Sequence, residues 1–102
     1  MAQIVAQFTY NAYIIDVPER VENNAKKISN AFDKWLYDKS NDHGLWLTVN
    51  GKKKAAIGFG CEDFVRYLNE YVIEDGEKKA EILQVFQDPY YKPEKEMKIL
   101  YF

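Results

Sequence analysis

The clearest alternation of apolar and polar residues flanks Asn50-Gly51, in the stretch LWLTVNGKKKAAIGF at 45–59. Asn and Gly tolerate the positive φ angles of a tight turn, so this stretch predicts a β-hairpin. A two-residue turn would mix the leucines with lysines on one face, whereas a bulged three-residue loop at 49–51 keeps them apart. We therefore expect the bulged loop and a buried face made of the odd positions: Leu45, Leu47, Ala55, Ile57 and Phe59.

The N-terminal third of the chain combines two different periods. Residues 3–15 alternate with period two, which predicts one long strand with a buried face, and a break near Tyr10-Asn11 is the alternative. From Pro18 to about Lys39 apolar residues recur at three- and four-residue steps, which predicts an amphipathic helix with proline in its first turn. Its apolar stripe comprises Val21, Ala25, Ile28, Phe32 and Trp35.

The C-terminal half predicts a second helix from Cys61 to a stop at Gly76, with Cys61, Phe64, Leu68, Tyr71 and Val72 facing inward. Residues 77–87 favour a third helix by composition, but a turn at Asp75-Gly76 would make 82–86 a strand instead. Prolines make 88–93 an extended connector, and the apolar run at 97–102 predicts a closing strand.

These elements follow the order β-α-β-β-α-(α)-β, which predicts an α+β fold. We expect a four-stranded, mostly antiparallel sheet with two or three helices packed on one face and the hairpin 45–59 at its centre. The 102 residues suffice for a single globular domain, and an apolar content of 47% is that of a chain with a packed core.

Charge and cysteine content narrow the classes of function. Fourteen basic residues against 16 acidic ones argue against binding to nucleic acid or membrane surfaces by bulk charge. The N-terminal stretch has no basic region and carries polar residues throughout, so we expect neither a signal peptide nor a membrane span. A single cysteine, Cys61, forms no internal disulfide and suits a reducing cytoplasm.

Catalytic chemistry has little support in the sequence. Cys61 follows Gly58-Phe59-Gly60 at a helix start, a position that lowers thiol pKa values, but Glu62 and Asp63 oppose a thiolate there. His43 is the only histidine, and no spacing of Cys and His residues is typical of a metal site. We expect no catalytic residue, metal or cofactor, and keep a small enzyme built on Cys61 and His43 as the last alternative.

Single-stranded nucleic-acid binding is the second hypothesis. It depends on Trp46 and on the run Lys52, Lys53 and Lys54, because base stacking on an aromatic ring beside lysines is the chemistry of such sites. A tryptophan that covers a lysine stem explains the same residues without a ligand.

The leading hypothesis is a non-enzymatic protein-binding module. Acidic residues dominate 60–77, where a surface made of the second helix would engage a basic partner surface, such as that of a nucleic-acid-binding protein. Small single-domain chains of this profile include phage- and mobile-element-encoded inhibitors, anti-CRISPR proteins among them. Self-association through a sheet edge is left open. The predicted contact residues are Glu62, Asp63, Arg66, Glu70, Glu74, Asp75, Tyr90 and Tyr91.

Overall fold

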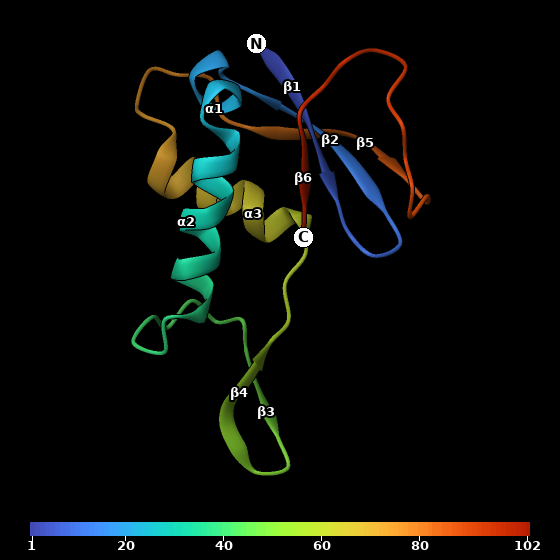
Figure 1. The fold of residues 1–102 in the computed structure, drawn as a ribbon. Helices are drawn as coiled ribbons and strands as arrows, with labels where there is room; N and C mark the ends of the chain where they lie inside the picture. The colour runs from blue at the N-terminus through green and yellow to red at the C-terminus, as the bar shows by residue number, and fades with distance from the viewer.

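The computed structural model describes residues 1–102 and contains a four-stranded sheet, helices on one face of it, and a separate two-stranded hairpin (Figure 1). The α+β class and the four-stranded, mostly antiparallel sheet are confirmed: the order is β5-β2-β1-β6, with only the β1–β6 pair parallel. The elements are β1 (Ala2–Gln7), β2 (Ala12–Val17), α1 (Glu19–Asn23), α2 (Ala25–Tyr37), β3 (Trp46–Val49), β4 (Lys52–Ile57), α3 (Cys61–Tyr67), the π-helical turn η1 (Leu68–Val72), β5 (Glu81–Phe86) and β6 (Ile99–Tyr101).

The predicted element order is wrong at its start, because two strands take the place of the single first strand. The alternation at 3–15 belongs to two antiparallel strands, β1 and β2, and the break near Tyr10-Asn11 is confirmed. A short turn joins them, closed by a hydrogen bond of 2.8 Å from the Phe8 amide to the Asn11 carbonyl. Both strands share the period of two, so the alternation continues across the turn and hides it.

Residues 77–87 do not form the expected third helix. The alternative of a strand is correct, because β5 pairs antiparallel with β2 and occupies one edge of the sheet. Ile82 lies opposite Ile15, and an irregularity in the register leaves Leu83 without a partner residue. Pairing with β2 thus outweighs the helix propensity of this segment, which is only a weak preference.

The two helical segments were predicted correctly in place, with differences in detail. Asn24 separates α1 from α2, and its side-chain Nδ2 donates to the Arg20 carbonyl, a bond that competes with helix continuation. The second helix changes to the wider π-helical turn at Leu68 and ends at Val72, four residues before Gly76. Tyr71, expected to face inward, is exposed because that turn rotates it outward.

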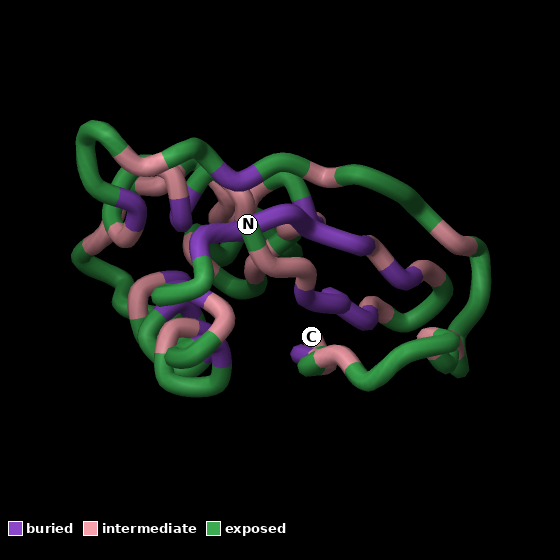
Figure 2. The backbone as a smooth tube through the Cα atoms, turned by 90° about the horizontal axis from the view of Figure 1, so that it is seen from above, coloured by how far each residue is buried: buried purple, intermediate pink, exposed green.

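The core lies between the sheet and the helices, and Figure 2 shows buried backbone concentrated along the middle strands. The opposite face of the sheet is crossed by the connector 87–98, which joins β5 to β6. Gln7 holds the start of this connector by donating from Nε2 to the Asp88 carbonyl at 3.1 Å. Fully buried core side chains include Ile4, Ile15, Val17, Val21, Phe32, Leu36, Phe64 and Leu68.

The hairpin of β3 and β4 is confirmed as a hairpin, but it lies outside the four-stranded sheet and projects from the body (Figure 1). We call residues 46–57 the arm. The arm gives the molecule a longest dimension of 46 Å and a radius of gyration of 14.4 Å, against about 13 Å for a compact chain of this size.

The predicted loop of the arm is wrong. Its predicted buried face is confirmed only in part, because Leu45, Ile57 and Phe59 pack against the core whereas Leu47 and Ala55 are exposed. Asn50 and Gly51 form a two-residue turn with φ angles of 50° and 77°, the pair of positive values that a type I′ turn needs. The bulge lies within β4 instead, around Lys54, whose φ is 56°. Because of the shift in register at this bulge, Trp46 lies opposite Ile57. Leu47 and Val49 are 47% and 46% exposed, so the arm carries apolar residues that the body does not cover.

Candidate binding surfaces

The acidic residues predicted to contact a partner fall into two groups. Glu62 and Glu70 are exposed on α3 and η1, and Glu74 and Asp75 are exposed in the turn that follows. None of these four forms a salt bridge, so their charges remain available to a partner. We call them the acidic surface. Asp63 differs, because its carboxylate accepts a hydrogen bond of 2.8 Å from the Gly60 amide and caps the start of α3.

The turn that carries Glu74 and Asp75 is held in place by Glu77. The Glu77 carboxylate accepts hydrogen bonds from the Glu74 amide and from the Arg20 guanidinium, and Arg20 also donates to the Val72 carbonyl. The hydrogen bond from Arg20 is the main reason that the pKa of Glu77 lies below its usual value. Arg20 therefore ties α1 to the end of η1 and orients the acidic turn.

The other predicted contact residues lie elsewhere. Arg66 is exposed beside the acidic surface and donates to the His43 carbonyl at 3.3 Å, near the base of the arm. Tyr90 is 83% exposed, and Tyr91 stacks on Phe86 with ring centroids 4.5 Å apart. Both tyrosines belong to the connector on the sheet face opposite the helices. The structure therefore does not join the acidic residues and the two tyrosines into one surface.

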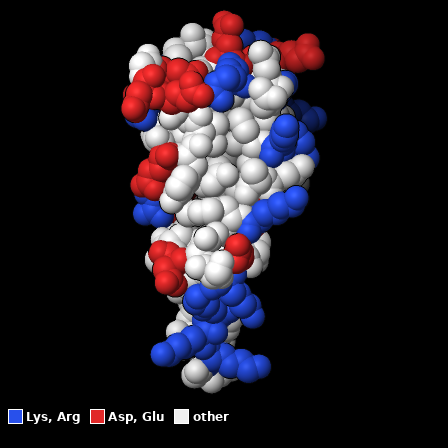
Figure 3. Space-filling view, turned by 90° about the vertical axis from the view of Figure 1, so that its left-hand side faces the viewer, with Lys and Arg blue, Asp and Glu red and all other residues white.

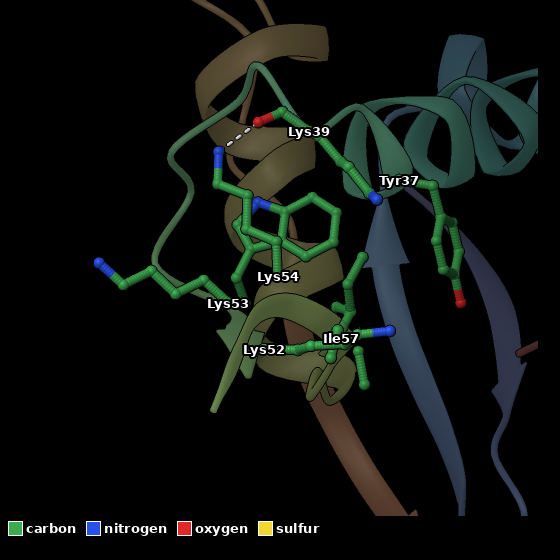
Figure 4. Close-up of a pocket in the computed structure, with 9 residues that line it drawn as sticks. Tyr37, Lys39, Lys52, Lys53, Lys54 and Ile57 are labelled. Atoms are coloured by element: carbon green, nitrogen blue, oxygen red, sulfur yellow. Dashed lines mark hydrogen bonds between the residues drawn. The ribbon is translucent and has the colours of Figure 1, made fainter. Parts of the chain in front are cut away.

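A basic hollow lies between the arm and the end of α2. It has a volume of about 500 Å³, and no acidic residue lines it. In Figure 4 the ammonium groups of Lys39 and Lys52 lie on the same side as the Tyr37 ring, whereas Lys53 points away. The hollow is lined by Tyr37, Lys39, Trp46, Lys52, Lys53, Lys54, Ala55, Ala56 and Ile57.

Trp46 and Lys54 contact each other at the base of the arm. The Lys54 Nζ lies 5.9 Å from the centre of the indole ring, forms a salt bridge with Asp42 at 3.5 Å, and donates to the Lys39 carbonyl. The Trp46 Nε1 donates to the Asn41 carbonyl at 2.8 Å, and the ring stacks on His43. These contacts engage much of the indole and leave it a poor platform for a base.

Tyr37 and Lys39 were not among the predicted site residues. Tyr37 is 65% exposed at the last position of α2, outside the apolar stripe of that helix, and Lys39 follows two positions later, after Asp38. An exposed aromatic residue two positions before a lysine at a helix end was the available signal. Its significance depends on the arm returning to this helix end, which the sequence pattern does not reveal.

Cys61 and His43 are engaged separately. The His43 ring lies between Trp35 and Trp46, and its nitrogens bond to the Leu36 carbonyl at 2.9 Å and the Leu45 amide at 3.1 Å. Because the Leu45 amide donates to Nδ1, His43 carries its proton on Nε2 in this arrangement. Neither nitrogen bonds to the Cys61 thiol, which is fully buried at the start of α3.

We expect Cys61 to resist alkylation in the folded protein. Burial, assisted by the charge of Glu62, raises the pKa of the thiol to about 12, so the thiolate is scarce at neutral pH. Near pH 8 only about one thiol in ten thousand would be ionised. Iodoacetamide labelling followed by mass spectrometry should show modification only after denaturation. Rapid labelling of folded protein near pH 8 would contradict the buried, neutral thiol.

Charge is distributed unevenly over the molecule. Figure 3 shows basic side chains covering the arm, whereas acidic and basic side chains are interspersed over the remainder of this face. The small net charge of −2 therefore conceals a basic end and an acidic surface. Each is a candidate for binding a partner of opposite charge.

Comparison of the chain with protein-family models, curated proteins and solved structures finds no match. No three or more His, Cys, Asp and Glu side chains gather in a way that could hold a metal ion. None of the helices combines the length and apolar character needed to cross a membrane.

Proposed function

We propose that this protein is a non-enzymatic protein-binding module whose acidic surface engages a basic surface of its partner. The observation that carries the proposal is the set of four exposed carboxylates, Glu62, Glu70, Glu74 and Asp75, none of which has a salt-bridge partner in the chain. A folded protein commonly scatters its acids among bases, whereas uncompensated charge of one sign favours association with the opposite sign.

The surroundings of these residues support a binding role. Arg20, Glu77 and the Asp63 cap fix the ends of the segment that carries them, which lowers the entropic cost of binding. The exposed ring of Tyr71 lies in the same segment and adds the kind of aromatic area that protein interfaces favour.

The partner class that fits best is a nucleic-acid-binding protein, because its binding groove is basic. By occupying that groove, the module would act as an inhibitor in the cytoplasm. Phages and other mobile elements encode small inhibitors of this kind against host defences, and anti-CRISPR proteins are examples. The likeness is one of size, charge pattern and absence of catalytic motifs, and it rests on no shared sequence.

Charge reversal of the acidic surface tests the proposal. We expect Glu70→Lys/Glu74→Lys to weaken partner binding by about tenfold or more, because each substitution replaces attraction by repulsion. The matched control is Glu94→Lys/Glu96→Lys, which makes the same charge change at exposed positions of the connector. Immobilised wild type and both variants would capture partners from host lysate, with quantification by mass spectrometry and competition by DNA.

The proposal predicts proteins that wild type and the control retain, that the Glu70/Glu74 variant loses, and that DNA displaces. Proteins retained equally by all three forms would show that the acidic surface is only a solvated face. Loss by both variants would show a dependence on net charge alone and would equally contradict a localised site.

A further inference from the structure

The base of the arm is anchored to the body, although the body leaves most of the arm uncovered. An isolated two-stranded hairpin is at best marginally stable in water. Here the base is fixed by the Trp46 contacts with Asn41 and His43 and by a hydrogen bond of 3.0 Å from the Gly58 amide to the Leu45 carbonyl. The exposed lysines and apolar residues farther along the arm add nothing to the core.

The hollow beside the arm combines uncompensated positive charge with a free aromatic ring. Lys39, Lys52 and Lys53 are exposed and form no salt bridge, whereas Lys54 is neutralised by Asp42. The Tyr37 ring is available for stacking because no aromatic contact within the chain involves it. The free ammonium groups of Lys39 and Lys52, which lie on the same side as the Tyr37 ring, favour a ligand with repeated negative charge, and the ring favours one that also carries flat groups.

We propose that this basic hollow binds single-stranded nucleic acid, with phosphates on Lys39 and Lys52 and a base stacked on Tyr37. A polyanion without bases would leave the tyrosine unused, and a duplex hides the faces of its bases in the stack. The site therefore differs from the expected stacking on Trp46, whose ring is already engaged.

This binding goes beyond the proposed protein contact and uses different residues. The acidic surface and the basic hollow share no side chain, so a substitution in one leaves the other intact. Reversing the charge of Glu70 and Glu74 should preserve oligonucleotide binding, and removing the arm lysines should preserve capture of a basic protein partner. The two sets of variants therefore distinguish failure of the protein-binding proposal from failure of the nucleic-acid-binding proposal.

Fluorescence anisotropy tests the site with four probes: labelled oligo-dT and oligo-U of about 20 nucleotides, a duplex of the same length, and oligoglutamate. We expect single strands to bind with a dissociation constant below about 100 μM at low salt, more tightly than the duplex or oligoglutamate. With two phosphate contacts, the slope of log K against log salt should be about −1.4 between roughly 50 and 200 mM.

Three substitutions locate the site. Lys39→Gln/Lys52→Gln should reduce binding to single strands by about tenfold or more and flatten the salt slope toward zero. Tyr37→Ala should weaken single-strand binding by about fivefold or more, and Tyr37→Phe should retain it, since a phenyl ring also stacks. The matched charge control, Lys26→Gln/Lys92→Gln, replaces two exposed lysines outside the hollow and should bind as wild type does.

Circular dichroism would verify that each variant melts as wild type does, as expected for exposed positions. The assignment is overturned by the absence of binding at about 100 μM protein in low salt. Equal affinity for oligoglutamate would show that charge alone fills the hollow, and preference for the duplex would exclude stacking on Tyr37. Equal loss in the control variant would show diffuse attraction and no site.

Discussion

Phe32→Ala is expected to lower the free energy of unfolding by about 3–5 kcal/mol, a large part of the 5–15 kcal/mol typical of a small domain. Phe32 is fully buried on the inner face of α2, where it joins the helices to the sheet and to the segment after the arm. Truncation would leave a cavity walled by aromatic rings, which are too large to collapse into it. The neighbouring rings belong to Trp35, Phe59, Phe64, Tyr67 and Phe102.

Urea unfolding followed by circular dichroism measures this loss. Tyr37→Ala is the matched control, because it removes an aromatic ring from the same helix at an exposed position, and it should change stability by no more than about 0.5 kcal/mol. An unchanged slope of the unfolding free energy against urea concentration would show that the folded and unfolded states of the variant are as compact as those of wild type. A loss below about 1 kcal/mol for Phe32→Ala would mean that this ring does not occupy the centre of the core.

Gln7→Glu is expected to destabilise the protein by about 3 kcal/mol or more at neutral pH. Gln7 is buried, and every hydrogen bond of its side-chain NH₂ group is donated to a backbone carbonyl. A carboxylate has no hydrogen to donate and would bring a negative charge against these oxygens. The Gln7 Nε2 donates to the backbone carbonyls of Phe8, Asn11 and Asp88 at 2.8, 3.2 and 3.1 Å.

The effect of Gln7→Glu should depend on pH. Burial beside carbonyls raises the pKa of the substituted carboxyl in the folded state above its unfolded-state value of about 4.3. Folding is therefore accompanied by uptake of a proton at pH values between the unfolded-state pKa and the folded-state pKa. The variant therefore recovers stability as pH falls toward that value and loses it as pH rises. Gln7→Met, which removes the donor without adding charge, should cost less and show no such dependence. Equal losses at about pH 5 and pH 8 for Gln7→Glu would contradict this account.

Elements with strong local signals were predictable from the sequence. The four-residue and three-residue spacing from Val21 to Trp35 identified the helical segment, and Asn50-Gly51 identified the hairpin. The strand at 97–102 followed from its apolar run and is β6 in the structure. These features depend on residues close together in the chain, where periodicity and turn chemistry are decisive.

Features that depend on distant pairing were not predictable. The helix formers of 77–87 become β5 because β2 offers an open edge, and the bulge at Lys54 changes the register of the arm without a glycine to mark it. The predicted site was divided for the same reason. The tyrosines at 90–91 and the acidic surface are near in sequence but lie on opposite sides of the sheet, whereas Tyr37 and Lys39 join lysines of the arm.

The parallel pairing of β1 with β6 sets the order in which the molecule can fold. Val5 lies opposite Ile99, and the Lys98 carbonyl accepts a hydrogen bond from the Val5 amide, so the sheet stays incomplete until residue 101 has left the ribosome. Such distant contacts slow folding, whereas an isolated hairpin closes in about 1–10 μs. The turn of the arm joins residues that are neighbours in the chain, so its closure does not wait for β6, whereas the four-stranded sheet does.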